Sequence, residues 1–169
     1  MIIFPVPGLI ELCVNKKDNS MSTRIKINQV EPAGYRAMIA MDKYVGSTRL
    51  SQTHSDLIKI RASQINGCAF CIDMHTRDAR KAGETEQRIY ALSAWRETPF
   101  FTPEERAILA LTEEVTLISN HVSDNTYQQA AGLFDEEYLA QIIMAIININ
   151  GWNRIGIATA MSPAPATGH

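Results

Sequence analysis

Apolar residues recur every three or four positions along most of this chain of 169 residues, a spacing typical of helices that pack into a core. The clearest helix start is Thr102-Pro103-Glu104-Glu105, with a capping threonine, a proline at the first helical position and a glutamate that completes a capping box. We expect helices over residues 32–44, 55–65, 68–82, 85–95, 103–118, 124–133 and 135–160. Residues 146–150 alternate and are also compatible with a strand, but strand patterns are otherwise absent. The sequence therefore predicts an all-α fold.

The charge pattern and the hydropathy pattern argue against two kinds of partner. The net charge is −2 and no cluster of Lys and Arg occurs, so we expect no nucleic-acid binding. The most apolar stretch, residues 140–160, contains Gln141, Arg154 and three asparagines, all costly in lipid. We therefore expect no membrane span.

The chain divides into one compact domain and two flanking segments. Residues 1–20 open with an apolar run and continue into a polar one, and we interpret them as an N-terminal extension. Residues 21–160 form the expected domain, and the Pro/Ala/Gly-rich residues 161–169 are expected to be a disordered tail. Three cysteines are too few for a secreted disulfide scaffold, which favours a cytoplasmic location.

Cys68-Ala69-Phe70-Cys71 is the segment that most directly suggests chemistry. Two thiols three residues apart can close into a disulfide, and Asn66-Gly67 places Cys68 at the opening turn of a helix, where free N–H groups lower a thiol pKa. His75 follows Cys71 by one helical turn. Asp56 would approach His75 if the two neighbouring helices pack as a hairpin, and would then orient the imidazole for proton transfer. These residues predict a redox-active dithiol.

Other interpretations of the same residues stay open. A structural zinc site would use Cys68, Cys71 and His75, with His54 or Asp56 as the fourth ligand, although such sites usually combine two separated pairs of ligands. The cysteines could also be small buried apolar residues. A thioredoxin-type site requires a βαβ unit, and this sequence has none.

The run from Asp56 to His75 resembles the alkylhydroperoxidase D-like branch of the carboxymuconolactone decarboxylase superfamily. The specific match is Ser63-Gln64-Ile65-Asn66-Gly67-Cys68 with Cys71 and His75, and the similarity extends over about residues 21–160. The resemblance implies an all-helical bundle with the CxxC motif at a helix start. It also implies a homotrimer or homohexamer. We interpret the polar residues 151–154 as structural, with hydrogen bonds across a subunit interface.

The resemblance also implies a role for each residue of the site. Cys71 is the peroxidatic thiol that attacks a hydroperoxide, and Cys68 resolves the sulfenic acid into a disulfide. His75 and the carboxylate of Asp56 form the proton relay. The helix dipole alone would favour Cys68 as the more acidic thiol, so the assignment of Cys71 depends on the resemblance and on the histidine one turn after it.

Two positions depart from the pattern of the family. Glutamate is usual where Asp56 stands, and the shorter side chain would need a water molecule to reach His75. Alkylhydroperoxidase D itself has a histidine where Phe70 stands, and phenylalanine cannot relay protons. We therefore expect weaker peroxidase activity or a different substrate.

The leading hypothesis is a peroxidase that reduces alkyl hydroperoxides and takes electrons from a dithiol donor such as a lipoyl protein, with no bound cofactor or metal. The first alternative is a lactone decarboxylase, but that branch does not depend on a CxxC pair. The second is a non-enzymatic redox sensor, in which the disulfide changes a surface or an assembly state.

Overall fold

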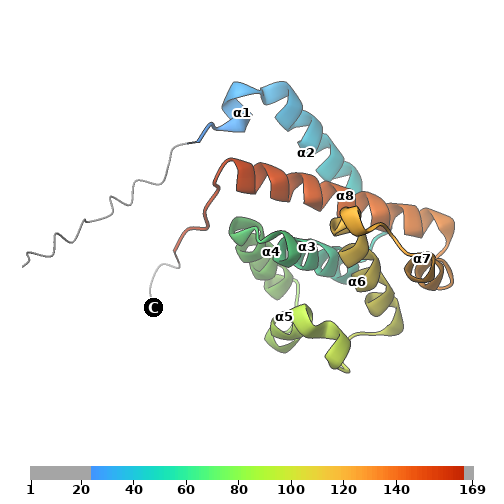
Figure 1. Ribbon diagram of the computed structural model, residues 1–169. Helices are drawn as coiled ribbons and strands as arrows, with labels where there is room; N and C mark the ends of the chain where they lie inside the picture. The colour runs from blue at the N-terminus through green and yellow to red at the C-terminus, as the bar shows by residue number, and fades with distance from the viewer. Residues whose placement is uncertain (1–23, 166–169) are drawn as a thin grey trace, which may run out of the picture.

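The computed structural model describes residues 24–165, and all regular structure in this part of the chain is helical. The predicted extension at 1–20 and the last four residues of the predicted tail lie outside the described residues. Figure 1 shows the helices α1 (Ile27–Val30), α2 (Pro32–Gly46), α3 (Gln52–Asn66), α4 (Ala69–Lys81), α5 (Glu86–Ala91), α6 (Pro103–Thr116), α7 (Asp124–Ala131) and α8 (Glu136–Ala158). Two short 3-10 helices, η1 (Leu92–Glu97) and η2 (Ile118–Asn120), complete the set. The all-α prediction is confirmed.

Helix α8 is the central element of the bundle. It contacts α2, α3, α4, α6 and α7, and Figure 1 shows it running between α2 on one side and the α3–α4 pair on the other. Its first turn is capped by Asp135, whose side chain accepts a hydrogen bond from the Tyr138 backbone N–H. Residues 146–150 lie in the middle of this helix, so the strand interpretation of that segment is wrong.

The start signal at Thr102 is confirmed in detail. The Thr102 hydroxyl accepts a hydrogen bond from the Glu105 backbone N–H, and the Glu105 carboxylate accepts one from the Thr102 N–H, which is the reciprocal pair of a capping box. Glu105 also accepts a 2.7 Å hydrogen bond from Arg88, so the same carboxylate joins α5 to the start of α6.

Several predicted helix boundaries need correction. Helix α3 begins at Gln52 rather than Ser55, because the Ser51 side chain caps the helix by accepting from the His54 N–H. The single helix predicted over 85–95 is two helices, α5 and η1, and Ala94 has a non-helical backbone. Helix α7 ends two residues earlier than expected, and α1 was not predicted.

Two apolar clusters meet at α3. Ile58 and Ala62 belong to a cluster shared with α6 and α8, whereas Leu57 and Ile60 belong to a second cluster with α4, α5 and η1. All four side chains are at most 2% exposed. Burial on both faces, at about 25 cal/mol per Å² of apolar surface, fixes the helix that leads into the CxxC motif.

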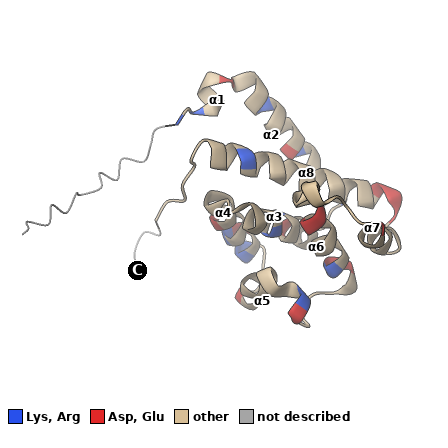
Figure 2. Cartoon of the chain, viewed as in Figure 1, with Lys and Arg blue, Asp and Glu red and all other residues tan. Residues whose placement is uncertain are grey.

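Charged residues are spread over the helices of the described part of the chain. Figure 2 shows acidic and basic residues interspersed over the helices of the described part, without a basic stripe. Within residues 24–165, no helix is both long and apolar enough to cross a membrane.

Candidate functional site

The two cysteines lie at the joint between α3 and α4. Gly67 has φ of +71°, the left-handed conformation that favours glycine, and ends α3. The Cys68 N–H donates to Ser63 O and the Gly67 N–H to Gln64 O, the two hydrogen bonds of a Schellman motif. Cys68 then caps α4, because its Sγ atom accepts a hydrogen bond from the Cys71 N–H at 3.3 Å. Cys68 therefore closes one helix and opens the next, as the Asn66-Gly67 pair predicts.

A network of side-chain amides holds this joint against α8. Asn66 Nδ2 donates to both Asn150 Oδ1 and Asn153 Oδ1 at 2.9 Å. Asn153, which is fully buried, in turn donates to Ser63 Oγ at 3.0 Å. Asn153 of the segment 151–154 thus has a structural role through hydrogen bonds within the chain, and hydrogen bonds across a subunit interface stay a prediction.

The sulfur atoms of Cys68 and Cys71 form a disulfide and are packed beneath α8. Both residues are buried, at 2% and 3% exposure. Gly156 of α8 faces them: a Cβ atom at this position would lie 3.2 Å from Cys68 Sγ and 3.6 Å from Cys71 Sγ. Gly156 is therefore a functional candidate that the sequence analysis missed, because nothing in its sequence context distinguishes it.

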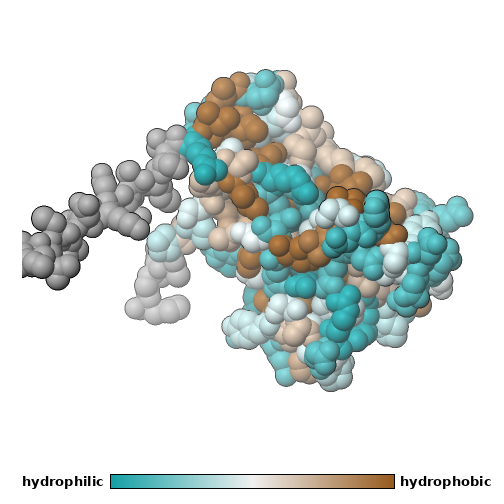
Figure 3. Space-filling view, viewed as in Figure 1, coloured by the Kyte–Doolittle hydropathy of each residue, from teal (hydrophilic) through white to brown (hydrophobic). Residues whose placement is uncertain are grey.

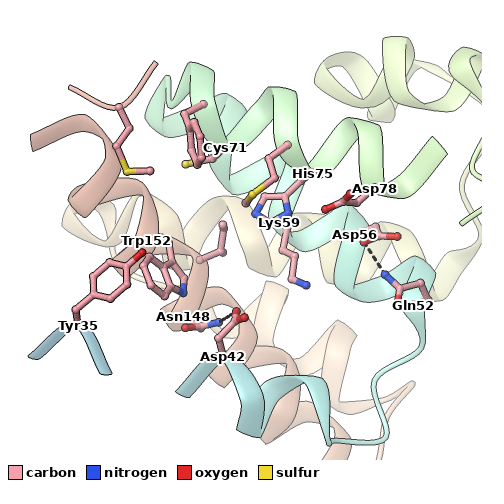
Figure 4. A pocket seen from close by; sticks show the side chains of 14 residues that line it. Tyr35, Asp42, Gln52, Asp56, Lys59, Cys71, His75, Asp78, Asn148 and Trp152 are labelled. Carbon is pink, nitrogen blue, oxygen red and sulfur yellow. Dashed lines mark hydrogen bonds between the residues drawn. The ribbon is translucent and has the colours of Figure 1, made fainter. Parts of the chain in front are cut away.

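A cavity of about 450 Å³ opens beside the disulfide, between α2, α3, α4 and α8. Cys71, His75 and Asp56 all line it, whereas Cys68 does not. Figure 4 shows the arrangement, with Cys71 and His75 projecting from α4 and Trp152 on the opposite wall. The residues that complete the lining are Tyr35, Asp42, Gln52, Lys59, Phe70, Met74, Asp78, Asn148, Ile149 and Met161. The structure thus brings three of the four predicted site residues to one cavity, with the fourth bonded to Cys71 behind its wall.

His75 is neutral in this site at neutral pH. Burial, together with the positive charge of Lys59, lowers the pKa of His75 to about 4, against the opposing effects of Asp78 and Asp42. A neutral imidazole has one nitrogen that can accept a proton and one that can donate, which is the state a proton relay requires.

Asp56 reaches the cavity but accepts its hydrogen bond from another residue. Its Oδ1 atom accepts from Gln52 Nε2 at 2.9 Å, and within the described residues no hydrogen bond joins Asp56 to His75. Burial raises the pKa of Asp56 above its usual range, against the opposing effects of the Gln52 hydrogen bond and of Lys59. A water-bridged contact between Asp56 and His75 therefore stays a prediction.

The histidine proposed as a further zinc ligand lies elsewhere. His54 Nδ1 is 2.7 Å from the Tyr138 hydroxyl, and the His54 ring packs edge-on against Phe134 and Tyr138. His121 is exposed and follows η2. Within residues 24–165, no group of three or more His, Cys, Asp and Glu side chains is arranged to hold a metal ion.

An all-helical bundle with a CxxC disulfide at a helix start, next to a cavity that contains a histidine, defines the class of this protein. Residues 32–114 match the model of the carboxymuconolactone decarboxylase family. The chain is 51% identical over 139 residues to the uncharacterized protein YdfG of Bacillus subtilis (strain 168), a match that spans 82% of this chain and 95% of that protein.

Solved structures agree with this relationship. A protein of unknown function from Agrobacterium tumefaciens, with a suggested AhpD-type role in antioxidant defence, is 40% identical, with a TM-score of 0.81 over 84% of this chain and 99% of that one. The debrominase Bmp8 is 19% identical, with a TM-score of 0.73 over 82% of this chain and 74% of that one, and shows the shared fold alone. This chain belongs to the carboxymuconolactone decarboxylase family and, within it, to the alkylhydroperoxidase D-like proteins.

Proposed function

We propose that this protein is a peroxidase that reduces alkyl hydroperoxides through the Cys68–Cys71 pair. The observation that carries the proposal is the position of Cys71. This residue lines a cavity large enough for a small organic molecule, beside the neutral His75, and it is bonded to Cys68 on its other side. A peroxidatic thiol needs access to substrate, and a resolving thiol needs access only to its partner. Cys71 meets the first requirement because it lines the cavity, and Cys68 meets the second because it is bonded to Cys71 and does not line the cavity.

The proposed cycle has three steps. The Cys71 thiolate attacks the terminal oxygen of ROOH, the O–O bond breaks, and the RO⁻ group leaves as ROH after taking a proton, so that Cys71 is oxidised to a sulfenic acid. The Cys68 thiol attacks that sulfur, the S–S bond forms, and the sulfenic oxygen leaves as water. An external dithiol then reduces the disulfide and is itself oxidised, and we propose a lipoyl-type dithiol for this role.

His75 would move the proton in the first step. It accepts the proton from the Cys71 thiol and returns it to the departing alkoxide. The negative charge of a Cys71 thiolate would raise the pKa of His75 above its value in the disulfide form, which makes the imidazole a better base when one is needed. Asp56 would support this relay through a water molecule. No bound cofactor takes part in the cycle.

The test is a thiol count in a Cys13→Ser background, because Cys13 would otherwise add a third thiol. The reduced, metal-free protein is treated with one equivalent of cumene hydroperoxide and examined by intact mass and free-thiol titration. The protein with both cysteines should lose two thiols as an intramolecular disulfide. Cys68→Ser should gain one oxygen at Cys71, and Cys71→Ser should not react.

Other outcomes would favour the alternatives. Slow, unselective oxidation in all three proteins would reject the peroxidase, and release of carbon dioxide from a carboxymuconolactone would then favour the decarboxylase. A disulfide that forms with no turnover when dithiol is supplied, but with a change in assembly, would favour a redox sensor. Stoichiometric zinc that protects the thiols from oxidation would favour a metal site.

We further propose a homotrimer or homohexamer in a reducing cytoplasm. Several large apolar side chains of α8 and its surroundings are exposed, among them Ile147 at 49% and Ile157 at 46%. Figure 3 shows another apolar patch over α1, where Ile25 and Val30 are each 63% exposed. Exposed apolar surface of this kind is typical of subunit interfaces. Light scattering after size exclusion would test the oligomer directly, and a monomer would reject it.

A further inference from the structure

One of the residues that line the cavity has a polar atom without a partner. Asn148, on α8, is 2% exposed and lines the cavity. Its Nδ2 atom donates to Asp42 Oδ1 at 2.9 Å, but its Oδ1 atom is buried and has no hydrogen-bond partner among the described residues. A buried carbonyl left without a donor costs about 1–3 kcal/mol, so such an atom calls for an explanation.

The chemistry of the pair defines which atom of Asn148 is free. If the amide were turned over, its oxygen would face the Asp42 carboxylate and two acceptors would meet. The observed orientation, in which Nδ2 faces Asp42, is therefore the favourable one. The atom that remains is an acceptor, and only an N–H or O–H group can satisfy it.

The rest of the cavity suits the apolar body of an organic molecule. Tyr35 and Trp152 pack edge to face, with their ring centroids 5.3 Å apart, and both line the cavity together with Phe70 and Met74. A volume of about 450 Å³ is in the range of small-molecule sites and far exceeds what hydrogen peroxide would fill.

The free oxygen does not lie next to the reactive sulfur. Figure 4 shows Cys71 toward one end of the cavity and the Asn148–Asp42 pair toward the other. A hydrogen bond to Asn148 would therefore come from a part of the bound molecule remote from the bond that reacts.

We propose that this cavity binds an organic molecule with a flat apolar body and one N–H or O–H donor remote from the reacting bond, and that Asn148 Oδ1 accepts a hydrogen bond from that donor. The inference deepens the proposed function, since the reacting bond would be the O–O bond of a hydroperoxide at Cys71. The substrate class is then a donor-bearing aromatic hydroperoxide, and simple alkyl hydroperoxides make only the apolar contacts.

The test measures binding without any peroxide, on the disulfide form of the full chain. Calorimetry compares 2-naphthol with 2-methoxynaphthalene, and indole with 1-methylindole, because each pair differs by the donor hydrogen and one methyl group. The wild-type protein should bind the donor-bearing member of each pair about tenfold more tightly, the effect of one buried hydrogen bond. In Asn148→Ala the two members of each pair should bind with about equal affinity.

Asn125→Ala, at an exposed position of α7 outside the lining of the cavity, is the control for the substitution. It should retain the preference. A second readout that needs no variant is the side-chain amide ¹⁵N–¹H resonance of Asn148, which should shift on addition of 2-naphthol and much less on addition of its methyl ether.

Three outcomes would overturn the proposal: no binding of any of the four probes, equal affinities within each pair in the wild-type protein, or a preference that survives in Asn148→Ala. The thiol count described above does not involve Asn148. A failed thiol count with intact probe selectivity would therefore reject the peroxidase and keep the binding site, and the reverse result would do the opposite.

Discussion

Gly156 lies so close to Cys68 that a methyl group at this position would sit 3.2 Å from the Cys68 Sγ atom. Gly156→Ala should raise the helix propensity of α8, but the added methyl group would crowd the two sulfur atoms, which cannot move away because the disulfide and helix α4 hold them. We expect a net loss of about 1 kcal/mol in the free energy of unfolding of the disulfide form. Because two separate thiols need more room than a disulfide, reduction by dithiothreitol should also slow. Urea denaturation and a thiol-release time course measure these effects.

The control for this substitution is Gly46→Ala. Nothing lies within 4 Å of a Cβ atom added at Gly46, the last residue of α2. This variant should unfold within about 0.5 kcal/mol of the wild-type protein and release thiols at the same rate. Equal effects of the two substitutions would show that Gly156 does not act through the sulfurs.

The buried neutral state of His75 should make stability depend on pH. The native pKa is about 4, below the ordinary value of 6.5, so between these values the unfolded chain binds a proton that the native disulfide form does not. The free energy of unfolding should therefore rise as the pH increases from 4 to 6.5, by on the order of 3 kcal/mol from this group. Urea denaturation of wild type and His75→Gln across this range isolates the contribution, because carboxylates common to both proteins cancel.

Lys59 should be visible in the titration of His75. Its positive charge helps to lower the pKa of His75, so Lys59→Met should raise that pKa above 4. The value should stay below 6.5, because burial is the larger cause. An NMR titration of the His75 ring proton measures the shift, and Lys43→Met, on the exposed side of α2, serves as control. An unchanged His75 titration in Lys59→Met would contradict the placement of the lysine.

The amide network should contribute strongly to stability. Asn153→Ala removes a fully buried side chain and leaves Ser63 and Asn66 each with one hydrogen bond fewer. We expect a loss of about 2–3 kcal/mol in the free energy of unfolding, measured with urea. Asn125→Ala, at an exposed position of α7, should stay within about 0.5 kcal/mol. A loss equal to that of the control would mean that the network adds little.

Phe70 lines the cavity next to Cys71 in sequence and offers no proton. Phe70→His places an imidazole between the two cysteines, where alkylhydroperoxidase D has one, and should raise peroxide-dependent turnover several-fold, within the range of general acid–base catalysis. Steady-state rates with cumene hydroperoxide and a dithiol donor measure the change. If turnover stays the same while the protein remains folded, the missing histidine does not limit the relay.

The sequence predicted the helical class and the position of the CxxC motif because those features depend on local signals. The Thr102 capping box and the Asn66-Gly67 stop each act within a few residues, and both were read correctly. Boundaries without such a clear signal were not predicted correctly; one example is the division of residues 85–95 into two helices at Leu92.

The parts of the site that were missed come from other helices. Gly156, Lys59 and the Asn148–Asp42 pair meet the cysteines only after α2, α3 and α8 have packed against α4. Asparagines in a buried helix indicate structural hydrogen bonds, but periodicity does not identify their partners, which for Asn153 are Asn66 and Ser63 of the same chain.

The network of Asn66, Asn150, Asn153 and Ser63 contains no group that gains or loses a proton at ordinary pH. Two groups with a displaced pKa, His75 and Asp56, lie instead in the cavity that opens beside the disulfide. The hydrogen bonds of the amide network therefore do not depend on pH, whereas the charge of the cavity does. In the proposed peroxidase, a change in acidity would therefore alter the charge of the cavity without altering the hydrogen bonds that hold the two cysteines.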